Sequence, residues 1–497
     1  MIGEVKGDVA VFKGVPYAKP PVENLRFAPP EPPDPWKEDR ECFTFGNCAI
    51  QEPSLLVNTT PSEDCLYLNL WVPTNLEGKK APVFFWIHGG GYYNGCGTMN
   101  YYDGTAFAQK GIIVVTINYR LGVLGFLGLK TLYDEFGTTG NWGTLDQIAA
   151  LKWTKENIAA FGGDPEAITI AGESAGSFSV SNLVLSPLTK GLFKQAIMQS
   201  GSVFENFAAV PYTQSMLKPT MDMSAAFAQS LGAEDTPEGL AKLRQMDALD
   251  LWKAGFFSSD VTVSCPFAFW ATLDGTVIPE NPVDALMTGR YNPCNVLMGF
   301  NQNEGIVFMS DQSTEDGARD YINRIFSETS AKEVRNYYKE QGLTDMQCIP
   351  DLVTYTYFKA GMTFFKETLA RQGAAVYGYE FDFTGDGNYP MQQLGAHHAL
   401  DILYVFDTIE TAGLTAGDAG EFVENQMHDL WCNFVKTGNP NEGDPLPDPT
   451  LWEKYKDTDP KTYYISDKVH FGPTEDMGKI RFFQNLSPGP LTVYVGD

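Results

Sequence analysis

The sequence has few basic residues. Its 35 Lys and Arg residues stand against 62 Asp and Glu residues, which gives a formal net charge of -27 at pH 7 over 497 residues. Binding to a nucleic acid or to an anionic membrane surface requires positive charge at the contact. We therefore expect no nucleic-acid partner and no binding to an anionic membrane surface, and we interpret the acidic excess as a solvated surface.

Long apolar runs are also missing. No stretch reaches the roughly 18 apolar residues that a membrane-spanning helix needs. Residues 1–7 lack the basic start and the apolar centre of a signal peptide. We therefore expect no membrane span and a cytoplasmic location, or a secreted protein if the sequence was trimmed from a longer precursor.

Cysteine is scarce, with eight residues in the chain and no CxxC or Cys/His cluster at metal-ligand spacing. The composition excludes a disulfide scaffold, and we expect no metal site. Cys42, Cys48 and Cys65 lie close together in the sequence. A Cys48–Cys65 disulfide and three free thiols are both open alternatives, since a reducing compartment favours the thiols.

The chain also lacks internal repeats, low-complexity segments, charge blocks and linkers. Its length alone would suggest two or three domains. Because no boundary is visible and 43% of the residues are hydrophobic, we predict a single α/β domain over residues 1–497. Residues 203–262 and 310–372 have mostly helical spacing, and we expect them to be insertions over a central sheet.

The most informative stretch that is present reads Gly-Glu-Ser-Ala-Gly at residues 172–176. An apolar, β-rich run over 167–171 precedes it, and an apolar pattern of helical spacing follows over 177–185. Strand, sharp turn and helix form the context of a nucleophile elbow, in which the helix N-terminus favours a developing anion. We predict Ser174 as the nucleophile and the N–H of Ala175 as an oxyanion donor; the alternative is a glycine-rich turn with a capping serine.

A second glycine cluster follows the apolar run at residues 82–87, which is typical of a central strand buried on both faces. Consecutive glycines let neighbouring N–H groups point the same way. A His-Gly-Gly-Gly loop that precedes the elbow is the oxyanion loop of hydrolases. We predict Gly90 and Gly91 as further oxyanion donors and expect His88 to brace the loop.

The segments around the elbow alternate between strand and helix. Residues 112–117 predict another buried strand, and residues 140–161 predict a capped helix before the elbow strand. This alternation is typical of an α/β fold with a mostly parallel central sheet that is flanked by helices.

Together these motifs resemble the type-B carboxylesterases of the α/β-hydrolase superfamily, the group that also contains the cholinesterases. The resemblance spans nearly the whole chain and rests on the order and spacing of residues 12–21, 63–69, 88–91, 118–122, 172–176, 199–202 and 431–441. It implies an α/β-hydrolase fold whose helical insertions form the walls of a substrate gorge. It also implies a serine carboxylesterase that hydrolyses small-molecule carboxylic esters without a cofactor.

The acid of a catalytic triad sits at a strand end beside the nucleophile strand. Residues 295–308 predict a buried strand that ends in a polar loop. In similar esterases a glutamate before a glycine takes this role, which Glu304 matches; the alternative is a solvated loop carboxylate. Asn303 stands where the family frequently has an acidic residue, and we expect this difference to leave the chemistry unchanged.

Five histidines limit the choice of the base. The order Ser, acid, His of the α/β-hydrolases points to residues 395–402. There the family pattern of a glycine, two residues and the base assigns the role to His398 and leaves the role of His397 open. Neighbouring histidines point apart and no carboxylate cluster accompanies them, so a metal site is not predicted. We expect His428 in a helix and His470 on a late polar segment.

The resemblance implies a mechanism through an acyl-enzyme. His398 would take the proton of Ser174, Glu304 would orient the imidazole, and water would then hydrolyse the acyl-enzyme. The family also has a supporting serine at the position of Ser200. We expect Glu173, next to the nucleophile, to tune the same site.

Other functions stay open. The same triad could act mainly on an amide, a lactone or a carbamate. Non-catalytic adhesion relatives of this fold have lost the catalytic serine or histidine, whereas both are present here. Cholinesterases hold a quaternary ammonium on a tryptophan, but the matching loop at residues 49–64 has no aromatic residue, so we expect no preference for choline esters. The choice between a monomer and a homo-oligomer also stays open.

Overall fold

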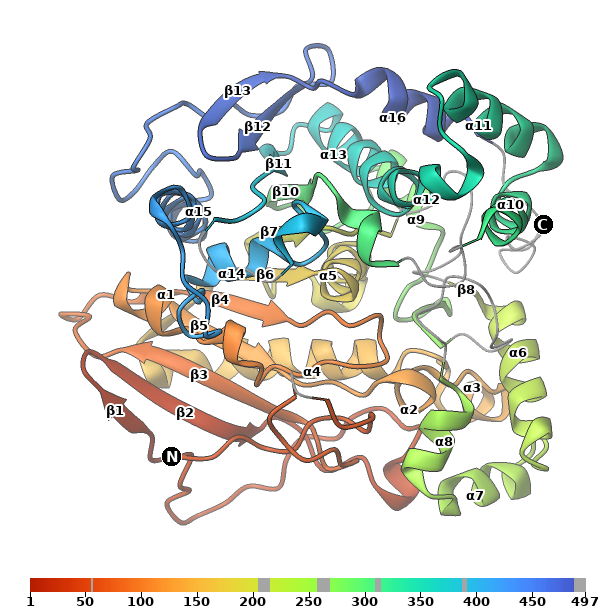
Figure 1. Ribbon diagram of the computed structural model, residues 1–497. Helices are drawn as coiled ribbons and strands as arrows, with labels where there is room; N and C mark the ends of the chain where they lie inside the picture. The colour runs from red at the N-terminus through yellow and green to blue at the C-terminus, as the bar shows by residue number, and fades with distance from the viewer. Residues whose placement is uncertain (55–56, 204–214, 257–268, 309–313, 387–390, 487–497) are drawn as a thin grey trace.

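A large, mostly parallel sheet forms the centre of the molecule (Figure 1). The computed structural model describes residues 1–54, 57–203, 215–256, 269–308, 314–386 and 391–486. In this part of the chain the sheet has 11 strands in the order β1-β2-β3-β5-β4-β6-β7-β10-β11-β12-β13. Pairing is parallel from β5 to β12 and antiparallel at both edges.

The strands lie where the apolar runs predict them, with ends that shift by a few residues. The strands of the large sheet are β1 (Glu4–Lys6), β2 (Val9–Pro16), β3 (Tyr67–Pro73), β4 (Ala81–Ile87), β5 (Ile113–Ile117), β6 (Gly163–Glu173), β7 (Gln195–Gln199), β10 (Asn295–Asn301), β11 (Val376–Phe381), β12 (Lys461–Ile465) and β13 (Val469–Pro473). A separate pair consists of β8 (Ser215–Met216) and β9 (Thr272–Leu273).

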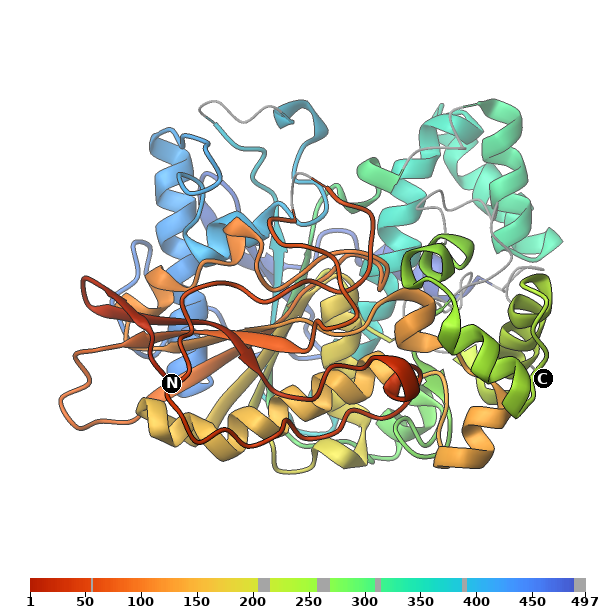
Figure 2. The same cartoon turned by 90° about the horizontal axis from the view of Figure 1, so that it is seen from below.

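Helices cover both faces of the sheet, which explains why its central strands are apolar throughout. Along β4, Phe85 and Ile87 belong to one hydrophobic cluster, whereas Phe84 and Trp86 belong to a second. The helices of the first cluster include α4 (Trp142–Asn157), α5 (Ala175–Leu185), α9 (Pro282–Met287) and α13 (Ala360–Arg371). Those of the second are α1 (Thr105–Gln109), α14 (Asp401–Phe406) and α15 (Asp418–Thr437). Figure 2 shows α4 and α15 on opposite sides of the strands.

The first predicted insertion is helical but is divided more finely than its spacing indicates. It holds α6 (Leu217–Ser230), α7 (Pro237–Gln245) and α8 (Ala248–Ala254), which lie near α2 (Gly122–Phe126) and α3 (Lys130–Phe136) in Figure 1. The structure has two helices within the helical spacing over 237–251. The Asp247 carboxylate accepts the N–H groups of Leu249 and Asp250 and starts a new helix there.

The second predicted insertion has a hydrophobic core of its own. It holds α10 (Glu315–Ile325), α11 (Glu328–Glu340), α12 (Asp345–Val353) and the π-helical turn η6 (Thr354–Lys359). These elements share a third hydrophobic cluster with α16 (Met477–Gln484), and Figure 1 shows α16 beside α11. The short 3₁₀ segments are η1 (Glu23–Leu25), η2 (Asn100–Tyr102), η3 (Ile158–Phe161), η4 (Pro187–Thr189), η5 (Glu304–Phe308) and η7 (Gln392–Leu394).

Seven of the eight cysteines lie in the described part of the chain, and all seven are free and buried. The structure therefore has the free-thiol alternative at Cys42, Cys48 and Cys65, and the Cys48–Cys65 disulfide is not formed. Within the described ranges, no helix has the length and apolar character that crossing a bilayer requires.

Candidate active site

Ser174 occupies a sharp turn between β6 and α5. Its backbone angles are φ 55° and ψ −127°, a conformation that residues with a Cβ rarely adopt. Its N–H donates to the carbonyl of Gln199 at the end of β7, with an N···O distance of 3.0 Å. A Cβ on Gly172 would lie 2.4 Å from the carbonyl carbon of Gly176, and a Cβ on Gly176 would lie 2.0 Å from the carbonyl oxygen of Ile87. Close approach of three backbone segments therefore requires both glycines and fixes the serine in its turn.

The glycine loop after β4 packs against this turn. Gly90 has φ 103° and Gly91 has φ 62°, and a Cβ on Gly90 would lie 2.2 Å from the carbonyl oxygen of Asn94. A Cβ on Gly89 would lie 3.1 Å from the Cβ of Ser174. A side chain at Gly90 would thus collide with the loop itself and one at Gly89 would crowd Ser174, whereas at Gly91 only the positive φ opposes a side chain.

The three predicted oxyanion donors come from two elements that meet beside Ser174. Gly90 and Gly91 line the same cavity as Ser174. Ala175 is the first residue of α5, so its N–H is one of the four at a helix start that have no acceptor within the helix. The placement suits the binding of a negatively charged oxygen.

His88 and Gln51 brace the glycine loop from behind. Nδ1 of His88 lies 2.7 Å from the carbonyl oxygen of Gly89, and its ring stacks on Tyr119 with centroids 4.5 Å apart. Burial lowers the pKa of His88 to about 4, so the ring is neutral. Gln51 exchanges two hydrogen bonds of 2.9 Å with the backbone of Gly95. Sequence analysis anticipated the brace at His88 but missed Gln51, which lies 44 residues from its partner.

Glu304 and His398 lie together as the sequence predicts. Glu304 opens η5 just after β10, is fully buried, and has its Oε2 2.6 Å from Nδ1 of His398. Its Oε1 accepts the N–H of Asn301 at 2.7 Å. The side-chain amide of Asn301 donates in turn to the carbonyl of His397 at 2.7 Å. Both oxygens of the Glu304 carboxylate therefore have partners, and the loop after β10 is joined to the loop that carries His397 and His398.

Asn303 has a structural role that sequence analysis did not anticipate. Its N–H donates to the carbonyl of Ala396 at 2.9 Å, and its Oδ1 accepts the N–H of Ala396 at 3.2 Å. A Cβ on Gly395 would lie 2.3 Å from the same Oδ1. Asn303 thus fixes the start of the loop that carries His398.

His397 does not join its neighbour at the cavity. Its Nδ1 lies 2.8 Å from the carbonyl oxygen of His398, and burial lowers its pKa. The cavity is lined by His398 and not by His397. Across the described ranges, no group of three His, Cys, Asp or Glu side chains is placed to hold a metal ion.

Glu173 contacts the second nitrogen of the same imidazole. Its Oε1 lies 3.1 Å from Nε2 of His398, and both side chains are buried. Burial raises the pKa of Glu173 to about 8. Burial alone would lower the pKa of His398, but the carboxylates of Glu173 and Glu304 outweigh it and raise that pKa to about 9. The hydroxyl of Ser174 has no hydrogen-bond partner among the described residues.

Asp401 is a buried carboxylate at this site that sequence analysis missed. It is fully buried and accepts hydrogen bonds from Gln199 at 2.8 Å, Tyr379 at 2.9 Å and Asn301 at 3.3 Å. Gln199 and Asn301 are the last residues of β7 and β10, and Tyr379 lies within β11, so Asp401 ties three strands together three residues after His398. The sequence signal for a buried carboxylate here is that Asp401 is the one acidic residue within the apolar run 399–406.

Ser200 lies close to the elbow but forms no hydrogen bond with Glu304 or His398. It is buried at φ 52°, and its N–H donates to the carbonyl of Gly299 at 2.8 Å. Its hydroxyl has no hydrogen-bond partner in the described part of the chain. A Cβ on the next residue, Gly201, would lie 2.9 Å from the carbonyl oxygen of Ser174.

A cavity of about 420 Å³ opens over these groups. Its wall is mainly aromatic, and no Lys or Arg of the described residues lines it. The lining residues are Gly89, Gly90, Gly91, Tyr92, Tyr93, Asn94, Gly95, Met99, Tyr101, Tyr102, Glu173, Ser174, Phe178, Phe256, Trp270, Phe308, Tyr357, Phe358, His398, Ala399 and Ile402. One cavity thus brings together a hydroxyl at a helix start, an imidazole held by a carboxylate and a loop of N–H donors. This arrangement suits acyl transfer.

Comparison with known proteins agrees with this geometry. The family model described as "Carboxylesterase family" matches residues 2–481. The para-nitrobenzyl esterase of Bacillus subtilis (strain 168) is 34% identical over 489 residues, 94% of each chain. Carboxylesterase 1C of Rattus norvegicus is 33% identical over 485 residues, 90% of this chain and 84% of the relative. A solved structure of PNB esterase superposes with a TM-score of 0.83 at 31% identity and covers 97% of both chains. The chain therefore belongs to the carboxylesterase family and is a carboxylic ester hydrolase with the α/β-hydrolase fold.

Proposed function

We propose that Ser174 is the nucleophile of this esterase, His398 its general base and Glu304 the acid that orients the base. The observation that carries the proposal is the 2.6 Å contact between Nδ1 of His398 and Oε2 of Glu304, at the wall of the cavity that Ser174 also lines. A carboxylate on Nδ1 fixes the imidazole tautomer that leaves Nε2 free to accept a proton.

The proposed reaction has two halves. The Ser174 oxygen attacks the ester carbonyl while its proton passes to Nε2 of His398, and the carbonyl oxygen becomes an anion. The N–H groups of Gly90, Gly91 and Ala175 bind that anion, and each donor lowers the barrier by roughly 3 kcal/mol. His398 then protonates the departing alcohol, and it later activates the water that cleaves the acyl-enzyme.

Glu173 competes with the nucleophile for the base in this proposal. Nε2 of His398 lies 3.1 Å from Glu173, so the imidazole must exchange this contact for the hydroxyl of Ser174 before proton transfer. Catalytic hydrogen bonds often form only in the substrate complex. We assign Glu173 the role of tuning the basicity of His398, and we assign Ser200 a supporting role because its buried hydroxyl has no partner among the described residues.

The proposed substrate is a small, uncharged ester with an aromatic or apolar group. No basic side chain of the described residues lines the cavity other than His398, and residues 204–214, 257–268 and 309–313 contain no Lys, Arg or His. A carboxylate on the substrate would thus meet Glu173 without a counter-charge. The para-nitrobenzyl ester in the name of the Bacillus subtilis relative is an ester of this kind.

We also propose that residues 1–497 form one domain whose two insertions make the walls of the substrate gorge. Phe256 of the first insertion lines the cavity, and so do Tyr357 and Phe358 of the second. Both predicted insertions thus contribute to the wall above Ser174.

The test is hydrolysis of p-nitrophenyl esters of increasing acyl length by the wild type and by Ser174→Ala, with intact mass measured after treatment with an organophosphate. We expect activity to vanish in the variant and one adduct to form on Ser174 in the wild type. Activity that survives in folded Ser174→Ala, or an adduct at another residue, would refute the assignment of the nucleophile.

A further inference from the structure

One turn of an otherwise regular helix near the active site is π-helical. Helix α12, the turn η6 and helix α13 follow one another without a break from Asp345 to Arg371, and the π-helical residues are Thr354–Lys359. Such turns are rare and occur frequently at functional sites. Here the turn lies between the loop that begins with Glu304 and a buried ion cluster.

On its active-site side, the turn packs directly against the residue after Glu304. The hydroxyl of Thr354 accepts the N–H of Gly305 at 2.9 Å and donates to the carbonyl of Pro350 at 2.9 Å. A Cβ on Gly305 would lie 2.0 Å from that carbonyl oxygen. The position of the turn and the position of the Glu304 loop therefore depend on each other.

The same turn presents Phe358 to the imidazole of His398. The two ring centroids are 4.9 Å apart, with an angle of 39° between the rings. The ring of Phe308 lies 5.0 Å from the same imidazole, and the two phenyl rings are 5.9 Å apart. The three rings thus form one cluster in which each ring contacts the other two, and the imidazole packs against the edge of this pair of phenyl rings. Glu304 holds Nδ1 only, whereas the phenyl rings restrict rotation of the imidazole about the bond to its Cβ.

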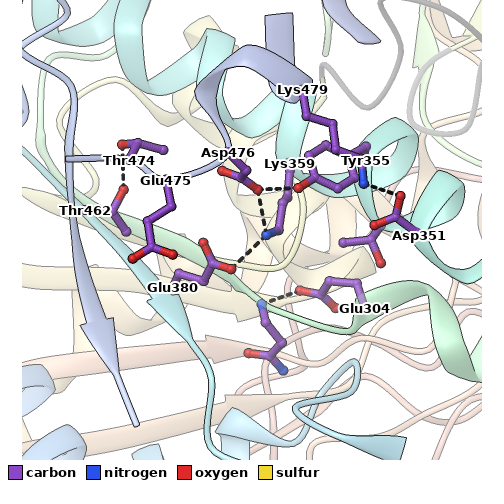
Figure 3. A network of polar contacts seen from close by, with 12 residues as sticks. Glu304, Asp351, Tyr355, Lys359, Glu380, Thr462, Thr474, Glu475, Asp476 and Lys479 are labelled. Carbon is purple, nitrogen blue, oxygen red and sulfur yellow. Dashed lines mark hydrogen bonds and ion pairs between the residues drawn. The ribbon is translucent and has the colours of Figure 1, made fainter. Parts of the chain in front are cut away.

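Lys359, the residue after Phe358, anchors the other side of the turn. Its Nζ lies 2.7 Å from Oε1 of Glu380 on β11 and 3.0 Å from Oδ2 of Asp476 at the start of α16, and Figure 3 shows it between the two carboxylates. The side chain of Lys359 is 4% exposed. Burial opposes the charge, but the two carboxylates raise the pKa of Lys359 above its ordinary value. A buried ammonium cannot leave its partners without a large cost, so Lys359 fixes the turn.

We propose that Phe358 is a positioning residue for the catalytic base: it holds the imidazole of His398 at the angle that serves Ser174, and the cluster of Lys359, Glu380 and Asp476 holds Phe358. The proposal rests on the proposed function because it takes His398 as the base. It extends that function to a residue outside the proposed triad.

Hydrolysis of a very small ester distinguishes the two possible roles of Phe358. Substituting a residue that only lines the wall should affect such a substrate little, whereas substituting a residue that positions the base should slow its hydrolysis. We would measure kcat and KM for p-nitrophenyl acetate and p-nitrophenyl benzoate with Phe358→Leu, Phe358→Tyr and Phe256→Leu. Phe256 lines the same cavity and packs on Tyr93 and Trp252, so its variant is the matched control for a lost wall.

We expect Phe358→Leu to lower kcat by about 10- to 100-fold on both esters, because small misplacements of a reacting group have effects of this size. Phe358→Tyr keeps the ring and should retain kcat within about threefold. Phe256→Leu should raise KM, more for the benzoate than for the acetate, without the fall in kcat on both esters that is expected of Phe358→Leu. If Phe358→Leu affects only the benzoate, or if Phe358→Tyr loses as much activity as Phe358→Leu, the proposal is wrong.

The anchor is tested by removing both members of its closest ion pair at once, since changing only one would leave the other unpaired in the interior. The remaining carboxylate, Asp476, is 20% exposed and keeps its hydrogen bond from the hydroxyl of Tyr355. Lys359→Met with Glu380→Met should lower kcat on both esters, and adding Phe358→Leu should then cost little more, because residues that act through one another are not additive. If the loss of kcat in the combined variant equals the product of the separate losses, the cluster does not act through Phe358.

Failure of this proposal is distinct from failure of the proposed function. Ser174→Ala and His398→Gln are run beside the Phe358 variants. If His398→Gln keeps its activity, the assignment of the base is wrong. If His398→Gln is inactive while Phe358→Leu is normal on both esters, only the positioning role is wrong. Far-ultraviolet circular dichroism and the melting temperature identify any variant that is lost to misfolding, and Phe358→Tyr serves as the folded reference.

Discussion

Replacing Glu173 by Gln removes a carboxylate from the nitrogen through which His398 is proposed to act. The pair lies 3.1 Å apart. The Coulomb energy at that distance is about 1.3 kcal/mol at a dielectric constant of about 80 and about 5 kcal/mol at about 20. Because about 1.4 kcal/mol corresponds to one pKa unit, the substitution should lower the pKa of His398 by about 1 to 4. We expect the lower half of that range, because burial raises the pKa of Glu173 to about 8 and part of its population is neutral.

The direction of the effect on activity follows from the role of the base. Only neutral His398 can accept a proton, so kcat/KM rises as pH increases through its pKa, which the two carboxylates raise to about 9. Without the charge of Glu173 the rise should occur at lower pH. The assay is kcat/KM for p-nitrophenyl acetate across the stable pH range, fitted for the apparent pKa values of the coupled pair.

A control separates this contact from the general loss of negative charge. Glu135 is an exposed carboxylate on α3, and Glu135→Gln should leave the profile unchanged, since surface charges are screened. The reasoning is refuted if the rise in kcat/KM with Glu173→Gln stays at the wild-type pH or moves to higher pH.

Three further predictions concern stability. Burial lowers the pKa of Lys366 from its ordinary 10.5 to about 8, which corresponds to about 3 kcal/mol of destabilisation. This cost is fully present below about pH 8 and is lost toward pH 10.5. In urea titrations, Lys366→Met should therefore raise the free energy of unfolding by about 1–3 kcal/mol at neutral pH. The gain should be smaller near pH 10. Gly305→Ala should lower the melting temperature and the activity together, because its Cβ would meet the backbone of Pro350 at 2.0 Å; an unchanged melting temperature would contradict the clash. Asp401→Ala removes the acceptor of three buried hydrogen bonds, from Gln199, Tyr379 and Asn301, and should cost about 3 kcal/mol or more in the same titrations. A loss below about 1 kcal/mol would show that the donors find other partners.

The sequence predicts those parts of the fold and site that short-range pattern controls. An apolar run such as 82–87 must lie in the interior whatever its neighbours are, and in the structure it forms β4. The elbow at Ser174 needs small residues on both sides for local steric reasons, and these are visible in five consecutive positions. The predicted esterase family is confirmed by the comparisons with known proteins, whereas the roles of the individual site residues stay predictions.

The parts that sequence analysis missed depend on contacts between distant residues. Gln51 supports the glycine loop through Gly95, which lies 44 residues away, and no local feature marks either position. Asp401 is explained only by the strand ends that surround it. The break before α8 follows from whether the Asp247 side chain turns back onto the backbone, a choice that apolar spacing does not encode.

The π-helical turn shows the same limit most clearly. The π-helical turn Thr354–Lys359 contains no proline or glycine, and its Thr, Tyr and Phe residues have low helix propensity, which does not specify a π-helical winding. The wider turn accompanies the contacts of Thr354 with Gly305 and of Lys359 with Glu380. Tertiary contacts on both sides of the helix therefore set its local winding.

The place of α16 has a consequence for how the protein is made. The second insertion consists of residues 310–372. Its hydrophobic cluster nevertheless includes Ile480 and Phe483 of α16, and the ion cluster around Lys359 includes Asp476. On the ribosome, more than one hundred residues must follow the insertion before these partners are synthesised. The wall beside His398 therefore closes late in synthesis, and a nascent chain that already carries Ser174 has an unfinished cavity until α16 docks.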